Sequence, residues 1–283
     1  MYEDIYGLSC IENHVLAILR ERGEEIDYLY HDSAVPLSEL YQSIVINGVR
    51  QEYFDKIRRI QDLLKELGII SLVKVQDKSP KKMAQYINNC GKDEYILLRV
   101  TREFTKASLF ARGFREDHYV LIEPDNDDYI IYNDIPERTL SIAGKQLKEI
   151  YDGDYFVLKI LRTLTDCDIN KLWDSRKYKP AAGEFIGLNG EDFEGIENYK
   201  TKLRGLLGVY KTLCLRMFRY YGKYIDMDFF KELIYRAGKY YSLLEYYNLK
   251  NVDEFDKYND IFQELAAIDN KTINQLTKQL EVA

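Results

Sequence analysis

An abrupt change of pattern near residue 163 constrains the fold of this chain more than any other feature. Four segments before it have the apolar content and the length of β-strands: Glu94–Val100, His118–Glu123, Tyr129–Asn133 and Tyr155–Ile160. From Glu197 onward no segment resembles a strand, and apolar residues recur at the spacing of α-helices. The sequence therefore predicts an α+β domain over residues 1–163, followed by an all-helical domain over residues 164–283.

Turn and cap residues indicate how the first domain is arranged. The segment 124–128, Pro-Asp-Asn-Asp-Asp, is typical of a turn, so it joins the second and third strands in an antiparallel hairpin. Residues 51–67 have helical periodicity and stop at Gly68, and a further strand is predicted over Ile69–Val75. A short helix begins at Ser79-Pro80, because proline suits the first turn of a helix.

Composition excludes several classes of protein. The 283 residues contain no apolar run long enough to span a membrane, and the acidic N-terminus, with Glu3 and Asp4, does not resemble a signal peptide. Four widely spaced cysteines lack metal-ligand spacing, which predicts a reduced, cytoplasmic protein without a metal. The net charge of −7 argues against a nucleic-acid partner.

Cys10 is the residue most suggestive of chemistry. It follows Ser9, and Glu12 lies three residues after that serine, so Ser9 is the expected N-cap of a capping box. Cys10 then occupies the first helical position, where free N–H groups and the helix dipole favour a thiolate. Such a position predicts a thiol pKa lowered from about 8.5 to roughly 3.5–7.5.

His118 and Asp134 are the predicted partners of Cys10. His118 begins one strand of the hairpin and Asp134 ends the other, so both lie at one end of the sheet. The three residues are interpreted as nucleophile, base and orienting group, as acyl transfer by cysteine requires. The main-chain N–H of Cys10 is a predicted oxyanion donor.

Alternatives to each role remain open. His14 lies one helical turn after Cys10 and is the second candidate base, although it is also typical of a packed residue. Asn133 competes with Asp134, because strand alternation brings only one of them to the correct face. Cys10 itself suits a structural role about as well as a catalytic one. His31 is predicted in a loop, and the remaining cysteines are interpreted as small core residues: Cys90, Cys167 and Cys214.

The C-terminal domain is rich in tyrosine and phenylalanine, most of which we expect in the helical core. Adjacent aromatic pairs cannot all point inward, so some can line a substrate groove. Arg216, Arg219 and Lys223 share a helical face, which is either solvated or able to meet an acidic partner.

Three motifs together resemble the papain-like cysteine-protease superfamily of bacteria. They are Gly7-Leu-Ser-Cys10 before a helix, His118-Tyr-Val-Leu-Ile122 at a strand start, and Tyr132-Asn-Asp134 followed by Pro136. Residues 1–163 resemble the leader-peptidase domains of bacteriocin exporters and, more closely, the N-terminal domain of the butirosin biosynthesis protein H family. They also resemble the amide-forming enzyme of closthioamide assembly.

This resemblance implies a papain-like fold, with Cys10 matching the nucleophile, His118 the base and Asp134 the third member. Leader peptidases place a glutamine about six residues before the cysteine, where this chain has Asp4, and an anionic Asp4 cannot donate to an oxyanion. The resemblance therefore implies an acyltransferase that moves an acyl chain from a carrier-protein thioester to an amine, with a peptidase or thioesterase as the alternative. It implies no cofactor beyond the phosphopantetheine arm that presents the substrate. The helical domain is then expected to form the substrate tunnel and to dock the carrier protein.

Overall fold

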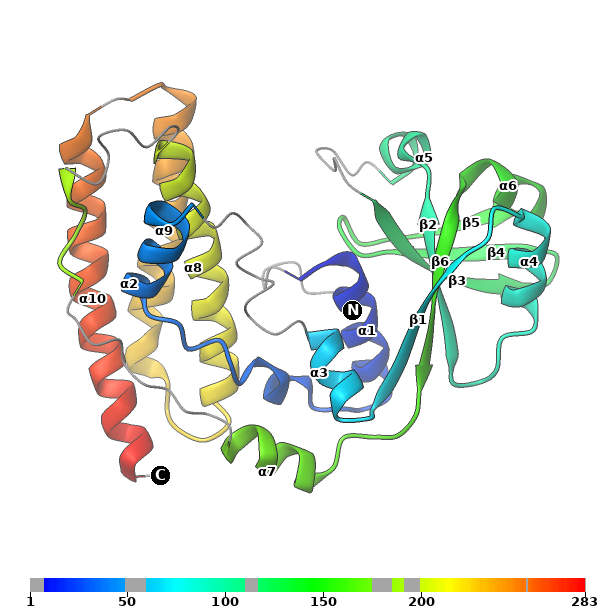
Figure 1. Cartoon of the computed structure of the whole chain (residues 1–283), viewed down its shortest axis with the longest axis horizontal. Coiled ribbons are helices and arrows are strands. Elements are labelled where there is room, and N and C mark those ends of the chain that lie inside the picture. The colour runs from blue at the N-terminus through cyan, green and yellow to red at the C-terminus, as the bar shows by residue number, and fades with distance from the viewer. Residues whose placement is uncertain are drawn as a thin grey trace. The chain divides into compact units, whose positions relative to one another are not determined.

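A six-stranded antiparallel sheet is the centre of the first of two units in the computed structural model (Figure 1). The structure describes residues 8–48, 60–109, 117–174, 185–190, 199–252 and 254–282. The strands follow the order β1-β6-β2-β3-β4-β5 across the sheet. Their bounds are Ile70–Gln76 (β1), Glu94–Val100 (β2), His118–Asp125 (β3), Asp128–Asn133 (β4), Arg138–Ala143 (β5) and Tyr151–Ile160 (β6).

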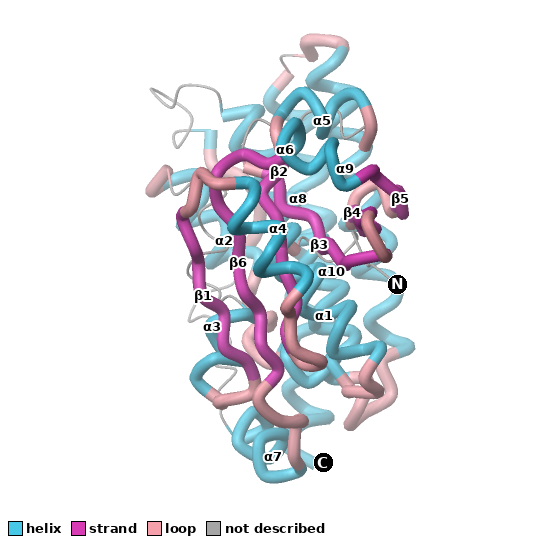
Figure 2. The backbone as a smooth tube through the Cα atoms, turned by 90° about the vertical axis from the view of Figure 1, so that its right-hand side faces the viewer, coloured by secondary structure: helices cyan, strands magenta, loops and turns pink. Residues whose placement is uncertain are grey.

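Helices cover both faces of this sheet, as Figures 1 and 2 show. On one face lie α1 (Cys10–Glu21) and α3 (Ile60–Glu66), and on the other lies α4 (Pro80–Asn88). The α4 face carries one continuous apolar core, in which Met83 and Ile87 of the helix meet alternating strand residues such as Leu98, Val120 and Ile131. Two short helices complete the unit, α5 (Arg102–Ala107) and α6 (Leu147–Ile150).

The predicted strands of this unit are confirmed, and the hairpin forms at the predicted turn. Pro124 pairs with Tyr129 and Asp125 with Asp128, so the two strands are joined through the acidic turn. The sequence did not predict β5, in which Thr139 and Ser141 are exposed and only Ile142 is buried. The predicted helix over 51–67 is described only from Ile60, and its earlier residues lie outside the described part of the chain.

The second unit is helical. Its long elements are α8 (Tyr199–Tyr221), α9 (Lys231–Leu249, preceded by a 3-10 turn at Asp228–Phe230) and α10 (Phe255–Val282). The apolar stripe predicted on α8 is buried, including Leu203, Leu207, Tyr210 and Met217. An α+β fold with a helical C-terminal part is thus confirmed. Helix α7 (Asp166–Asp174) lies where the chain passes from the first unit to the second.

The division into units differs from the predicted boundary at residue 163. Residues 27–58 belong to the helical unit, and residues 59–168 belong to the sheet unit. The described part of this segment contains 3-10 helix η2 (Ile26–Tyr30), α2 (Leu37–Leu40) and the π-helical turn η3 (Tyr41–Ile46). Its contacts explain the difference, because the Leu37 N–H donates to Asp269 of α10 at 3.2 Å and Lys202 of α8 donates to the Val45 carbonyl at 3.3 Å.

Candidate active site

Cys10 occupies the first position of α1, as predicted. Ser9 is the N-cap: its hydroxyl accepts from the Glu12 N–H at 3.3 Å, and its own N–H donates to the Glu12 carboxylate at 3.0 Å. Both bonds of the capping box are therefore present, which confirms the prediction. Glu12 also accepts from the Ile60 N–H at 3.0 Å, so the first turn of α1 is tied to the start of α3.

His118 is the first residue of β3, and its ring contacts Asn133, the last residue of β4. The His118 Nε2 atom lies 2.6 Å from Asn133 Oδ1. The amide nitrogen of Asn133 donates to the Pro136 carbonyl at 2.7 Å, which fixes the orientation of the amide. Since Oδ1 can only accept, Nε2 carries the proton of the neutral ring, and Nδ1 is the basic nitrogen.

Asp134 lies beside the same imidazole but is not its direct partner. Its Oδ1 is 3.9 Å from His118 Nε2, and its Oδ2 accepts from Asn13 of α1 at 2.9 Å. All of these side chains are buried. The expectation that only one of Asn133 and Asp134 reaches the site is wrong, because β4 ends at Asn133 and alternation does not extend into the turn that holds Asp134.

The thiol of Cys10 lies in the same cluster, within the field of Asp134 and in hydrogen-bonding contact with the Tyr119 main chain. Burial, followed by the negative charge of Asp134, raises the pKa of Cys10 to about 12. The main-chain N–H groups of Tyr119, Ile11 and Cys10 act in the opposite direction but do not compensate. The predicted lowering of this pKa is therefore wrong, because the loss of water outweighs the helix N-terminus.

His14 is also part of the cluster. Its Nε2 atom lies 3.2 Å from the Tyr119 carbonyl oxygen, and the residue is completely buried. Burial lowers the pKa of His14 to about 4, with a smaller contribution in the same direction from His118. A neutral ring whose Nε2 faces a carbonyl must donate from that nitrogen. The ring therefore acts as a hydrogen-bond donor to β3.

Sequence reasoning missed one residue of the cluster. Asn13 was not considered, although its position three residues after Cys10 puts it on the same side of the helix. His31 lies in a turn, as predicted, and belongs to the helical unit, where its ring centroid is 6.4 Å from that of Tyr220 in an edge-on arrangement. Asp4 and Gly7, which bear on the oxyanion donor and the first motif, lie outside the described residues.

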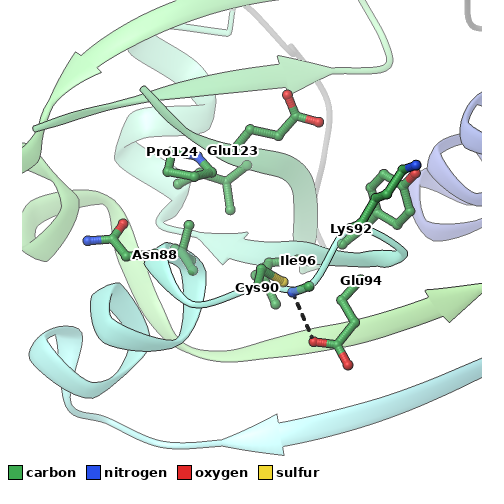
Figure 3. Close-up of a pocket in the computed structure, with 11 residues that line it drawn as sticks. Asn88, Cys90, Lys92, Glu94, Ile96, Glu123 and Pro124 are labelled. Carbon is green, nitrogen blue, oxygen red and sulfur yellow. Dashed lines mark hydrogen bonds between the residues drawn. The ribbon is translucent and has the colours of Figure 1, made fainter. Parts of the chain in front are cut away.

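The other cysteines differ from one another. Cys214 is buried, as predicted for a core residue, whereas Cys167 is exposed, so the prediction is wrong for that residue. Cys90 is half-buried and lines a pocket of about 250 Å³ (Figure 3). The pocket lies near the C-terminal end of β3, whereas His118 begins that strand. Burial and the nearby carboxylate of Glu94 raise the pKa of the Cys90 thiol.

The basic face predicted on α8 is only partly solvated, because the side chains of Arg219 and Lys223 are 40% and 30% exposed whereas Arg216 is buried. Arg216 is only 4% exposed and packs over the ring of Tyr30 at 5.6 Å. Arg219 and Lys223 both lie near Asp27, at 3.7 and 3.9 Å. Each of the three side chains thus has a neighbour within its own unit.

Comparison of the chain with protein-family models and with curated proteins gives no match. Within the described ranges, every helix is too short or too polar to cross a lipid bilayer.

Proposed function

We propose that this protein is a cysteine-dependent acyltransferase with a papain-like catalytic unit, which moves an acyl chain from a carrier-protein thioester to an amine. The observation that carries this proposal is the cluster around His118. A cysteine at a helix start, a histidine at a strand start and an asparagine on the far ring nitrogen form the order of groups used by papain-like enzymes. Asp134 adds a carboxylate to this arrangement.

In the proposed mechanism Cys10 rests as a neutral thiol, in keeping with its raised pKa. Nδ1 of His118 takes the thiol proton as the sulfur attacks the thioester carbonyl. The carbon–sulfur bond to the carrier arm breaks, and the departing thiolate receives the proton. An acyl-enzyme on Cys10 and a free carrier thiol result.

The second half of the reaction reverses these roles. An amine attacks the acyl-enzyme, His118 takes one of its protons, and that proton returns to the sulfur of Cys10 as the amide leaves. Asn133 holds the ring in the useful tautomer, and the charge of Asp134 stabilises the imidazolium that forms in each step. The N–H groups at the start of α1 are the proposed donors to the oxyanion.

Burial supports transfer to an amine over transfer to water. His118, Asn133 and Asp134 are each no more than 3% exposed, so little water surrounds the base. A thioester is already activated, so the reaction requires neither a metal nor ATP. A dry site favours an acceptor that is bound by the protein over bulk water.

The test uses an acylated carrier protein, with mass spectrometry of the enzyme and of the products. The wild-type enzyme is expected to gain one acyl group on Cys10 and to release an amide when an amine is supplied. Cys10→Ala should form neither the acyl-enzyme nor the amide. Cys10→Ser is the control that keeps the size and shape of the side chain while replacing the sulfur. Unchanged turnover in Cys10→Ala would refute the mechanism, whereas release of free acid alone would identify a hydrolase.

A further inference from the structure

The strand that carries His118 extends past the end of its neighbour. Pairing between β3 and β4 runs from Asp125 with Asp128 to Leu121 with Tyr132. Tyr119 lies two residues beyond that last pair, where β4 has already ended at Asn133. On its other side Tyr119 is opposite Arg99 of β2. The edge of β3 that faces away from β2 therefore needs other partners at this residue.

Helix α1 supplies those partners. In an extended strand the N–H and the carbonyl of one residue point to the same side. The Tyr119 carbonyl oxygen lies 3.2 Å from Nε2 of His14, and the Tyr119 N–H is close enough to the sulfur of Cys10 to lower the pKa of the thiol. Cys10 and His14 are one turn apart on the helix, so a single helical face satisfies both groups.

We infer that His14 is a positioning residue: by donating to the Tyr119 carbonyl, it holds the Tyr119 N–H on the sulfur of Cys10, where this N–H stabilises the thiolate. The inference rests on the proposed function only in taking Cys10 as the nucleophile.

The surroundings of His14 suit this role. The groups acting on its ring include Asp134, His118 and the Tyr119 carbonyl, and burial keeps the ring neutral and able to donate. Tyr119 is also held from its side chain, because its hydroxyl donates to Asp154 at 2.6 Å and Arg99 donates to the same carboxylate at 2.9 Å. Main chain and side chain of Tyr119 are thus anchored independently.

The experiment measures the rate of Cys10 alkylation by iodoacetamide against pH, by peptide mass spectrometry. His14→Leu removes the donor, and His14→Gln keeps a donor at a similar reach. We expect His14→Leu to slow Cys10 alkylation by about three- to tenfold and to move its pH dependence upward, because a hydrogen bond to the thiolate is weakened. His14→Gln should stay within about twofold of wild type.

Cys90 in the same sample is the control, since its pocket contains no residue of the cluster. Its rate should be equal in all variants. If His14→Leu changes the Cys90 alkylation rate as well, His14→Asn is used in place of His14→Leu, because the asparagine side chain is polar but too short to reach the Tyr119 carbonyl. His14→Asn should then slow the alkylation of Cys10. Equal rates for the glutamine and asparagine variants, or faster Cys10 alkylation in His14→Leu with Cys90 unchanged, would overturn the inference. Alkylation needs neither carrier nor amine, so a failure of the proposed acyl transfer would leave this result interpretable.

Discussion

Asp134 should affect acyl transfer and thiol reactivity in opposite directions. Its carboxylate oxygen lies 3.9 Å from Nε2 of His118, within a buried cluster. At an effective dielectric constant of about 20, two unit charges at this distance attract by about 4 kcal/mol. Asp134→Asn removes that attraction from the imidazolium, while the new side chain keeps an oxygen for Asn13. We therefore expect transfer to slow by up to about a thousandfold.

The same substitution should make Cys10 a better nucleophile toward a small reagent. The charge of Asp134 helps to raise the pKa of Cys10, so its removal lowers that pKa and increases the thiolate fraction at a given pH. Iodoacetamide labelling between about pH 8 and about pH 10 should accordingly become faster.

Asn133→Ala is the matched comparison, because it removes a neutral partner of the same ring. It loses a hydrogen bond to the imidazolium, worth about 1.5–3 kcal/mol, which corresponds to a slowing of transfer by roughly ten- to a hundredfold. It should leave Cys10 labelling nearly unchanged, since no charge is lost. Our assignment of roles would be refuted if Asp134→Asn left transfer within threefold of wild type, or if it slowed both reactions.

Three further predictions concern stability, each measured by chemical denaturation. Burial raises the pKa of Asp269 to about 6, so between about pH 4 and about pH 6 the folded state holds a proton that the unfolded chain has lost. The stability of wild type relative to Asp269→Asn should therefore fall by about 2 kcal/mol as pH rises from about 4 to about 7, and a flat difference would contradict this. The Arg162 guanidinium holds the pKa of Asp168 well below its usual range. Asp168→Asn should therefore lower the free energy of unfolding near neutral pH, and lower it progressively less as pH falls below about 4. A loss of stability that is independent of pH would exclude the ion pair as its cause. Leu207→Ala, at a fully buried position of α8, should cost about 2–5 kcal/mol, whereas a cost below about 1 kcal/mol would mean that this part of the helical core is loosely packed.

Local signals in the sequence predicted the local structure of the site well. The capping box of Ser9 and Glu12 forms as expected because both partners lie within one helical turn. The hairpin that carries His118 and Asn133 forms at the acidic turn because its two strands and the turn between them are adjacent in the sequence. Elements decided by neighbouring residues could therefore be found without the structure.

Properties that depend on distant residues could not be predicted. The pKa of Cys10 is set by burial and by Asp134, which lies more than a hundred residues away in the chain, and neither is visible in the sequence around the cysteine. The choice between Asn133 and Asp134 depended on the residue at which β4 ends. Strand alternation places Asn133 correctly but does not extend to Asp134, which follows the end of β4. If β4 ended one residue earlier or later, a different side chain would contact the His118 imidazole.

The route of the chain between its two units has a practical consequence for anyone who wishes to isolate the sheet unit. The polypeptide leaves the sheet unit after residue 26, returns at residue 59 and leaves again after residue 168. A truncated protein ending at residue 163 would retain Leu37, Leu40 and Val45, which are buried in the intact chain, but would lack the helices that accompany them. Such a fragment should aggregate on expression, whereas replacing residues 27–58 with a short glycine-rich connection should give a more soluble form of the sheet unit.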